Sequence, residues 1–219
     1  MPAYWMISNR AIKNGLPSGE RGPLGYWVSD QGPLDNFKNW QSVSPETFKN
    51  LLAAAADKFP TLDQANNEQQ SHVSFFIHGY NNGWDDAAKR YQQLCADIYS
   101  GENNLGLCIS FDWPSRGSVI DYLPDRLHAR DCANDLANVF SQLYDWLIVK
   151  QQAAINNPKD ACKAKISVIA HSMGNYVLQK AMAAAWTRKN QPLLVSLINQ
   201  LIMVAADVDS KRLPTIPAV

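Results

Sequence analysis

Ser172 is the residue of this chain that is best placed for covalent chemistry. It follows the apolar run "ISVIA" and precedes a helical pattern that begins at Met173, so a buried strand is expected to turn there straight into a helix. Such a turn lifts the serine above the sheet edge and needs small neighbours, which Ala170 and Gly174 supply. The usual pentapeptide is G-x-S-x-G, and alanine is the mildest departure from glycine. The pattern predicts that Ser172 is a nucleophile.

A serine nucleophile needs fixed donors for the oxyanion that develops during attack. The N–H of Met173, at the amino end of a helix, is one predicted donor. We assign the second to the N–H of Tyr80, in the loop "HGYNNG" that follows the strand pattern "HVSFFI". The residues of this loop that we expect at the substrate site are His78, Gly79 and Asn81. The alternative is an ordinary strand-ending turn, for which Asn-Gly is well suited.

The base that would take the proton of Ser172 is not found by pattern. The chain has four histidines, and none follows His171. His171 adjoins Ser172 on a strand-like backbone, so its side chain is expected to point away and pack. His128 lies in a helical segment and His72 at the start of a strand, and structural roles are expected for both. His78 lies beside the predicted site, where ordering the loop is favoured over contact with substrate or action as the base.

Asp207 is the predicted catalytic acid. It ends the run "LIMVAAD", at the carboxyl end of an expected strand, from which a carboxylate can reach a histidine above the sheet. Asp209 is the neighbouring alternative, and a cap or turn role for Asp207 is equally favoured. Asp112 and Arg116 in "FDWPSRG" are candidate pocket residues, although a salt bridge that braces the loop is the favoured interpretation of that pair.

Alternating strand and helix patterns must position these residues. Buried strands are expected at 72–77, 105–111 and 164–170, with a fourth inside 197–206. Helices are expected at 84–101, at 121–149 and from Met173 onward. Strands joined by helices of this length pair in parallel. The predicted fold class is therefore α/β, a three-layer α/β/α sandwich with a mostly parallel central sheet.

The first 71 residues are expected to add outer elements to this sheet. The segments "AYWMIS" (3–8) and "LGYWVS" (24–29) cluster aromatic residues as edge strands do, and the Gly/Pro-rich segment 13–23 between them is predicted to be a loop. A helix is expected over 44–59, with Pro45 at its first position.

Composition excludes several classes of function. The 219 residues, 46% hydrophobic, suit a single domain over 1–219. Twenty basic and twenty acidic residues cancel without runs of like charge, so nucleic acid is not an expected partner. No stretch approaches the length of a membrane span, and "MPAYWMISNR" lacks a leader pattern, so a cytoplasmic protein is expected. Four scattered cysteines predict no zinc site and no other metal.

Four ordered motifs resemble those of a known superfamily: "FFIHGYNNGWDDAAKR", "FDWPSRGSVIDYLPDR", "VIAHSMGNYVL" and "VAADVD". They look like bacterial α/β-hydrolases, within them a group of serine esterase or lipase-like proteins, and cover about Val73 to Asp209. The resemblance implies an α/β-hydrolase fold, no cofactor, and hydrolysis of a small-molecule acyl ester by a serine, an acid and a histidine in that order. The strands that would carry the histidine are expected to be missing.

That expectation motivates an alternative function. A truncated or degenerate hydrolase domain would bind an acyl ligand or a protein partner without turnover. Missing strands would also leave an apolar sheet edge exposed, and such an edge predicts self-association.

Overall fold

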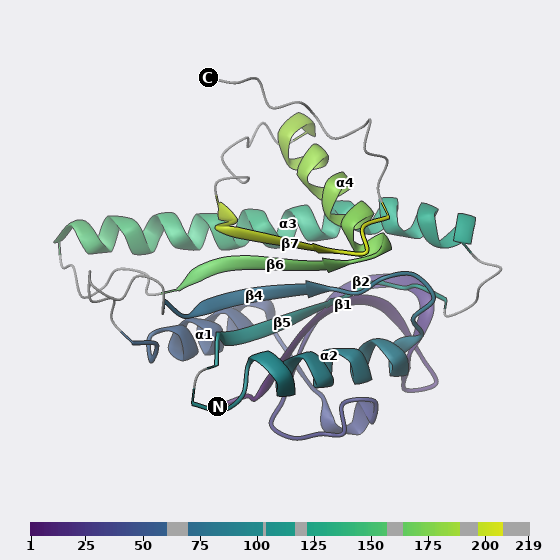
Figure 1. The fold of residues 1–219 in the computed structure, drawn as a ribbon, viewed down its shortest axis with the longest axis horizontal. Helices are drawn as coiled ribbons and strands as arrows, with labels where there is room; N and C mark the ends of the chain where they lie inside the picture. The colour runs from purple at the N-terminus through teal and green to yellow at the C-terminus, as the bar shows by residue number, and fades with distance from the viewer. Residues whose placement is uncertain (61–69, 103, 117–121, 157–163, 189–196, 208–219) are drawn as a thin grey trace.

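One mixed β-sheet organises the computed structural model, which describes residues 1–60, 70–102, 104–116, 122–156, 164–188 and 197–207 (Figure 1). Residues 122–124, 147–156 and 187–188 are described by their backbone alone. The strands in this part of the chain are β1 (Tyr4–Lys13), β2 (Leu16–Ser29), β3 (Gln41–Val43), β4 (His72–Ile77), β5 (Gly106–Asp112), β6 (Lys165–His171) and β7 (Gln200–Val204). The helices are α1 (Pro45–Ala56), α2 (Trp84–Ile98), α3 (Tyr122–Asn156) and α4 (Met173–Arg188), with a short 3-10 turn η1 (Phe37–Asn39).

The strand order confirms a mostly parallel central sheet. From one edge to the other the order is β3-β2-β1-β5-β4-β6-β7. The strands β1, β5, β4, β6 and β7 run parallel, while β2 and β3 are antiparallel additions at one edge. Because β4 lies between β5 and β6, the loop that follows β4 lies close to the carboxyl ends of both neighbours.

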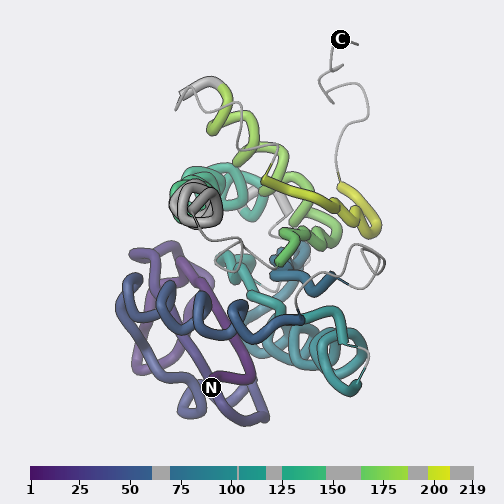
Figure 2. Tube along the Cα trace, turned by 90° about the vertical axis from the view of Figure 1, so that its left-hand side faces the viewer, coloured from purple at the N-terminus to yellow at the C-terminus, as the bar shows by residue number. Residues whose placement is uncertain are grey.

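Helices cover both faces of the sheet and complete the expected sandwich. On one face α1, α3 and α4 pack in a core that includes Phe75 and Val168. On the other face α2 packs against the next residues of the same strands, Phe76 and Ile169. The alternation follows from the period of two in a β-strand. Figure 2 shows α3 end-on, on the opposite side of the sheet from α2.

The first two strands differ from expectation. Neither is an edge strand, because β1 pairs in parallel with β5 and β2 is covered by β3. The predicted loop over 13–23 is wrong for most of its length, since β2 begins at Leu16 and only Asn14 and Gly15 join the strands. Both turn residues have positive φ, 51° and 77°, as a two-residue type I′ hairpin requires. Glycines and prolines inside β2 therefore do not interrupt the strand.

The helices lie close to their predicted ranges. Helix α1 begins at Pro45, and the Ser44 hydroxyl caps it by accepting the N–H of Thr47 at 3.0 Å. Helix α2 ends at Ile98, three residues before the expected end, and α3 continues to Asn156, beyond the expected end at 149.

The described part of the chain contains neither a membrane-spanning helix nor a cluster of metal-binding side chains. Cys95, Cys108 and Cys132 are buried free thiols, and Cys162 lies outside the described residues. No described helix is long and apolar enough to span a bilayer. The described residues also contain no group of three or more His, Cys, Asp or Glu side chains that could hold a metal ion.

Replacing Tyr91 by phenylalanine should destabilise the fold. The buried Tyr91 hydroxyl accepts the N–H of Trp5 at 3.0 Å and donates to the carbonyl of Cys108 at 2.7 Å, so it ties α2 to β1 and β5. Loss of the hydroxyl removes a partner from two buried backbone groups, and we expect about 1–3 kcal/mol less free energy of unfolding in urea. The control is Tyr4→Phe, whose ring packs edge-on against Tyr91. Equal losses in both variants would contradict the assignment to hydrogen bonding.

Candidate functional site

The strand-to-helix turn predicted at Ser172 is present. Ser172 lies between the last residue of β6 and the first residue of α4, and its φ is +50°, in the left-handed region that non-glycine residues seldom occupy. The Ser172 N–H donates to the carbonyl of Val204 at 2.8 Å, and the Ser172 carbonyl accepts the N–H of Asn175 at 3.0 Å. A strained serine held in this way is the geometry of a nucleophile elbow.

Gly174 allows the elbow to pack directly on the end of β4. A Cβ added to Gly174 would lie 2.4 Å from the carbonyl oxygen of Ile77 and 2.7 Å from that of His78. Both are backbone atoms that cannot move aside, so a larger residue would push α4 away from the sheet. The small residue at this position is thus required by the close approach of two backbones.

The loop "HGYNNG", which begins at His78, also packs against this turn. A Cβ added to Gly79 would lie 2.8 Å from the Cβ of Ser172 and 2.7 Å from Nδ1 of His171. The structure therefore brings together the backbone segments that contain Ser172, Met173 and Tyr80. Asn81 has φ of +59° and forms the sharp bend that follows. The roles of these residues as donors and substrate contacts remain predictions.

His78 orders this loop from inside the protein. Its ring is fully buried and stacks on Trp113, with 5.3 Å between centroids and 5° between planes. Nδ1 lies 3.0 Å from the carbonyl oxygen of Gly79, and Nε2 lies 3.1 Å from Asp112 Oδ1 and 3.2 Å from the Trp113 N–H. With both nitrogens engaged and no exposed surface, His78 supports the loop; substrate contact is not available to it in this arrangement.

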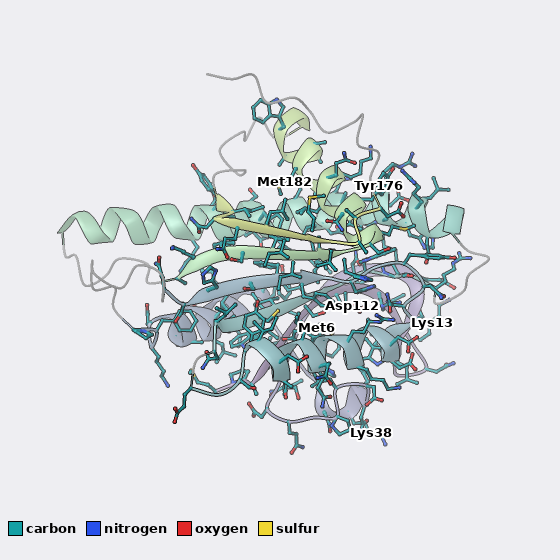
Figure 3. All side chains as sticks on the ribbon, viewed as in Figure 1. Met6, Lys13, Lys38, Asp112, Tyr176 and Met182 are labelled. Atoms are coloured by element: carbon teal, nitrogen blue, oxygen red, sulfur yellow. The ribbon has the colours of Figure 1, made fainter. Side chains whose placement is uncertain are left out.

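Asp112 forms a buried ion pair with Arg10, which the sequence did not indicate. Asp112 is buried at the carboxyl end of β5 (Figure 3), and Arg10 Nε lies 2.8 Å from its Oδ1. The expected salt bridge between Asp112 and Arg116 is therefore wrong, because Asp112 pairs with Arg10. The backbone N–H of Arg116 donates to the Asp125 carboxylate. Burial raises the pKa of Asp112, but Arg10 and His78 outweigh it and hold that pKa below its ordinary value.

Asp207 lies beside the elbow through its backbone. Its N–H donates to the Ser172 carbonyl at 3.2 Å, in a turn that contains Ala205 at φ of +45°. The backbone of Ser172 is thus hydrogen-bonded both to Val204, the last residue of β7, and to Asp207, three residues further along the chain. Whether the Asp207 carboxylate acts as the acid remains a prediction, and Asp209 lies outside the described residues.

Asn175 is a second residue that sequence reasoning missed. It is buried, and its Nδ2 donates to the carbonyls of Ala170 at 2.9 Å, Ser172 at 3.0 Å and Val204 at 3.4 Å. One amide therefore joins β6, the elbow and β7. The sequence shows that Asn175 lies three residues after Ser172. The carbonyl groups to which it donates are brought together only in the folded chain.

The other histidines do not bind the serine hydroxyl. His72 contacts the Ser167 hydroxyl at the amino end of the sheet, and His128 Nδ1 lies 3.3 Å from the Pro114 carbonyl. His171 is partly exposed and packs against Gly79; burial, together with Arg90 and His78, lowers its pKa. Among the described residues no imidazole is hydrogen-bonded to the Ser172 hydroxyl.

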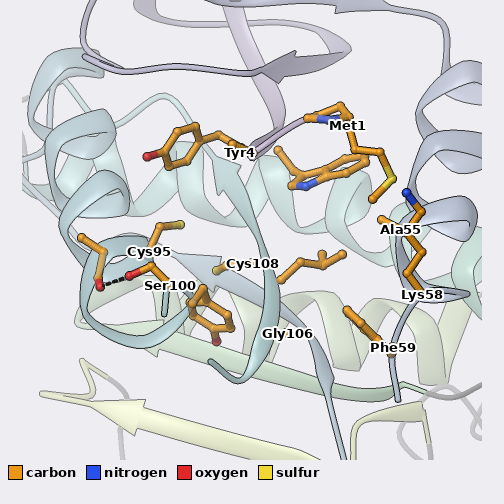
Figure 4. A pocket seen from close by; sticks show the side chains of 15 residues that line it. Met1, Tyr4, Ala55, Lys58, Phe59, Cys95, Ser100, Gly106 and Cys108 are labelled. Carbon is orange, nitrogen blue, oxygen red and sulfur yellow. Dashed lines mark hydrogen bonds between the residues drawn. The ribbon is translucent and has the colours of Figure 1, made fainter. Parts of the chain in front are cut away.

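A cavity of about 480 Å³ lies at the amino edge of the sheet (Figure 4). Its walls include Tyr4, Lys58, Tyr99 and Cys108. Gly106, which also lines it, is level with Lys165 across β4, and His171 is six positions further along β6. At about 3.3 Å per residue the cavity and the elbow are roughly 20 Å apart. This cavity is therefore separate from the Ser172 site.

Comparisons with known proteins agree with this geometry at the level of a family. A family model described as "Alpha/beta hydrolase of unknown function (DUF900)" matches residues 54–215. An uncharacterized protein of Nostoc sp. is 37% identical over 132 residues, which are 51% of this chain and 31% of that relative. The chain thus spans about a third of the length of this curated relative. No solved structure matches the chain.

Replacing Asp112 by asparagine should leave the buried Arg10 guanidinium without its counter-charge. We expect a loss of about 3–5 kcal/mol of free energy of unfolding at neutral pH, measured in urea. The folded-state pKa of Asp112 lies below the ordinary value of 3.8, so its contribution is complete above that value and is lost as the pH falls through the folded-state pKa. The difference between wild type and variant should therefore shrink only in strongly acid solution.

The control for this experiment is Glu20→Gln, which removes an exposed ion pair with Lys13. Exposed pairs contribute little, so this variant should unfold like the wild type. A D112N protein that matches wild-type stability at neutral pH would contradict the structural role of the buried pair.

Proposed function

We propose that this chain, which belongs to the family of α/β-hydrolases of unknown function, is a serine hydrolase that cleaves an acyl ester through an acyl-enzyme on Ser172. The observation that carries the proposal is the elbow: a serine with φ of +50° between β6 and α4, packed against the glycine of an HG loop. This arrangement presents a hydroxyl at the carboxyl edge of a parallel sheet, where open α/β sheets bind their ligands.

In the proposed reaction Ser172 Oγ attacks the ester carbonyl carbon and forms a new C–O bond. The carbonyl π electrons move to the oxygen, and the N–H groups of Met173 and Tyr80 bind the resulting oxyanion. A general base takes the Oγ proton during this attack. Collapse of the intermediate then breaks the C–O bond to the alcohol, and the alcohol leaves with that proton. Water then attacks the carbonyl carbon of the acyl-enzyme in the same way. This second attack releases the carboxylic acid product and restores Ser172.

Asp207 is the acid of this proposal, because its backbone is fastened to the elbow. An acid in a serine hydrolase orients a histidine and stabilises its charged form. The reaction requires a general base at Ser172 Oγ. None of the histidines at positions 72, 78, 128 and 171 is proposed for that role.

A fluorophosphonate probe should label Ser172 in the folded protein. A serine activated by its surroundings displaces the fluoride, so we expect one adduct per chain by intact mass, mapped to the peptide that contains Ser172. Ser172→Ala should abolish labelling, and Ser42→Ala, on the exposed strand β3, should not change it. Folded protein that remains unlabelled would remove Ser172 from the role of nucleophile. Turnover of p-nitrophenyl esters of increasing chain length then tests hydrolysis itself.

A second candidate function follows from β7. Its side chains from Leu201 to Val204 are 41–48% exposed, and in the described residues β7 pairs only with β6. An exposed apolar edge strand without charge or proline favours pairing with another strand. The second candidate is therefore a hydrolase-like domain that associates through β7 and binds a ligand or partner without turnover.

Self-association through β7 can be measured by sedimentation across a micromolar concentration range. We expect the wild type to dimerise and Ile202→Lys to be monomeric, because a lysine at the centre of β7 opposes edge pairing. The control is Ser42→Lys on β3, at the opposite edge of the sheet, which should still dimerise. A wild-type protein that is monomeric at every concentration would argue against this second candidate.

A further inference from the structure

The Arg10 side chain of β1 is a buried cation at the centre of a polar network. Only 1% of its side-chain surface is exposed. Nε donates to both carboxylate oxygens of Asp112, at 2.8 and 3.0 Å. Nη1 donates to the carbonyls of Ser115 and Ser18, at 2.9 and 3.3 Å, and Nη2 donates to the carbonyl of Asn82 at 3.2 Å. One side chain therefore joins the end of β5, the loops after β4 and β5, and β2.

Stability alone does not account for such a residue. Removing two charges from water costs on the order of several kcal/mol per ion, and buried pairs can often be replaced by apolar side chains without loss of stability. The guanidinium is planar, and its donors point in fixed directions. A buried arginine that binds three separate backbone segments is therefore suited to fixing their positions relative to one another.

Two series of contacts connect Arg10 to the carbonyl of Gly79. In the first, Asp112 contacts Nε2 of His78, and Nδ1 of His78 faces the Gly79 carbonyl at 3.0 Å. A carbonyl can only accept, so Nδ1 is the donor. In the second, the backbone carbonyl of Asn82 accepts a hydrogen bond from Arg10, and the Asn82 side chain donates from Nδ2 to the Gly79 carbonyl at 2.9 Å. The Gly79 carbonyl is thus held from two directions by buried side chains.

The direction of this carbonyl determines the direction of the Tyr80 amide. The Gly79 C=O and the Tyr80 N–H belong to one planar trans peptide unit, in which the two groups point in opposite directions. Because the carbonyl points into the buried network, the N–H points away from it. The same loop lies against Ser172, because a Cβ added to Gly79 would lie only 2.8 Å from the Cβ of Ser172.

We propose that Arg10, acting together with Asn82, is a positioning residue for oxyanion stabilisation, because it sets the direction of the Tyr80 N–H through the Gly79 carbonyl. The inference rests on the proposed function, since the Tyr80 amide needs a developing oxyanion to bind. Arg10 acts through other residues and leaves the ground-state binding of the ester unchanged. Its replacement therefore lowers kcat and leaves KM close to the wild-type value.

Arg10→Lys in the full chain tests this inference. Lysine keeps the charge but loses the rigid set of donors. With a p-nitrophenyl ester we expect kcat to fall about 10- to 100-fold, because removing an oxyanion donor costs about 100- to 1,000-fold and a misdirected one costs less. KM should change less than about twofold. Inhibition by a trifluoromethyl ketone, whose adduct carries the oxyanion, should weaken in the same proportion as kcat.

The matched control is Arg21→Lys, which makes the same change in a half-exposed arginine paired with Asp135. It should keep the wild-type kcat, and near-UV circular dichroism gives the folded fraction of each variant. If R10K does not fold, Asn82→Ala takes its place, because it keeps the Arg10–Asp112 pair and removes one of the two donors to the Gly79 carbonyl. The same split between kcat and KM is expected.

Three outcomes would overturn the inference, and they are distinguishable. Wild-type kcat and ketone inhibition in the folded variant, with S172A inactive, would remove the positioning role and leave the proposed function intact. A fall in kcat that only matches the fall in folded protein would assign Arg10 a structural role. A wild type that turns over no ester and binds no fluorophosphonate would sink the proposed function and the inference together.

Discussion

A close contact between two backbones at the carboxyl edge of the sheet is the constraint on which the site depends. The first turn of α4 packs directly on the end of β4. A Cβ added to Gly174 would lie only 2.4 Å from the carbonyl oxygen of Ile77. The contact exists because β4 and β6 are parallel neighbours, with Ile77 opposite Ala170. Since the chain must turn sharply there, Ser172 takes a left-handed conformation, held by Val204 and Asn175.

The buried polar network of Arg10, Asp112, His78 and Asn82 orders the loop "HGYNNG", whose backbone belongs to neither a helix nor the sheet. Loop carbonyls that are buried need donors, and Arg10, His78 and Asn82 supply them from inside the protein. The buried charge of Arg10 is compensated by Asp112, whose pKa is accordingly depressed. The site thus takes its rigidity from charged and amide side chains that are buried at the carboxyl ends of β4 and β5.

Other features of the molecule are distributed over different edges of the same sheet. The carboxyl edge carries the elbow and the HG loop, the amino edge carries the cavity, and β7 forms an apolar lateral edge. Val204 is common to two of them, because it ends β7 and accepts the N–H of Ser172. Anything that pairs with β7 therefore approaches a strand whose last residue is hydrogen-bonded directly to the backbone of Ser172.

The sequence by itself determined the features that depend on neighbouring residues. Strands β4, β5 and β6, helix α2, and the elbow at Ser172 follow from local periodicity and from small residues at a turn. Tertiary structure alone decided which distant segments meet. Arg10 binds Asp112 across 102 positions, and β1 lies inside the sheet because it pairs with β5. No local pattern encodes these partners, because desolvation and sheet order select them only after the chain has folded.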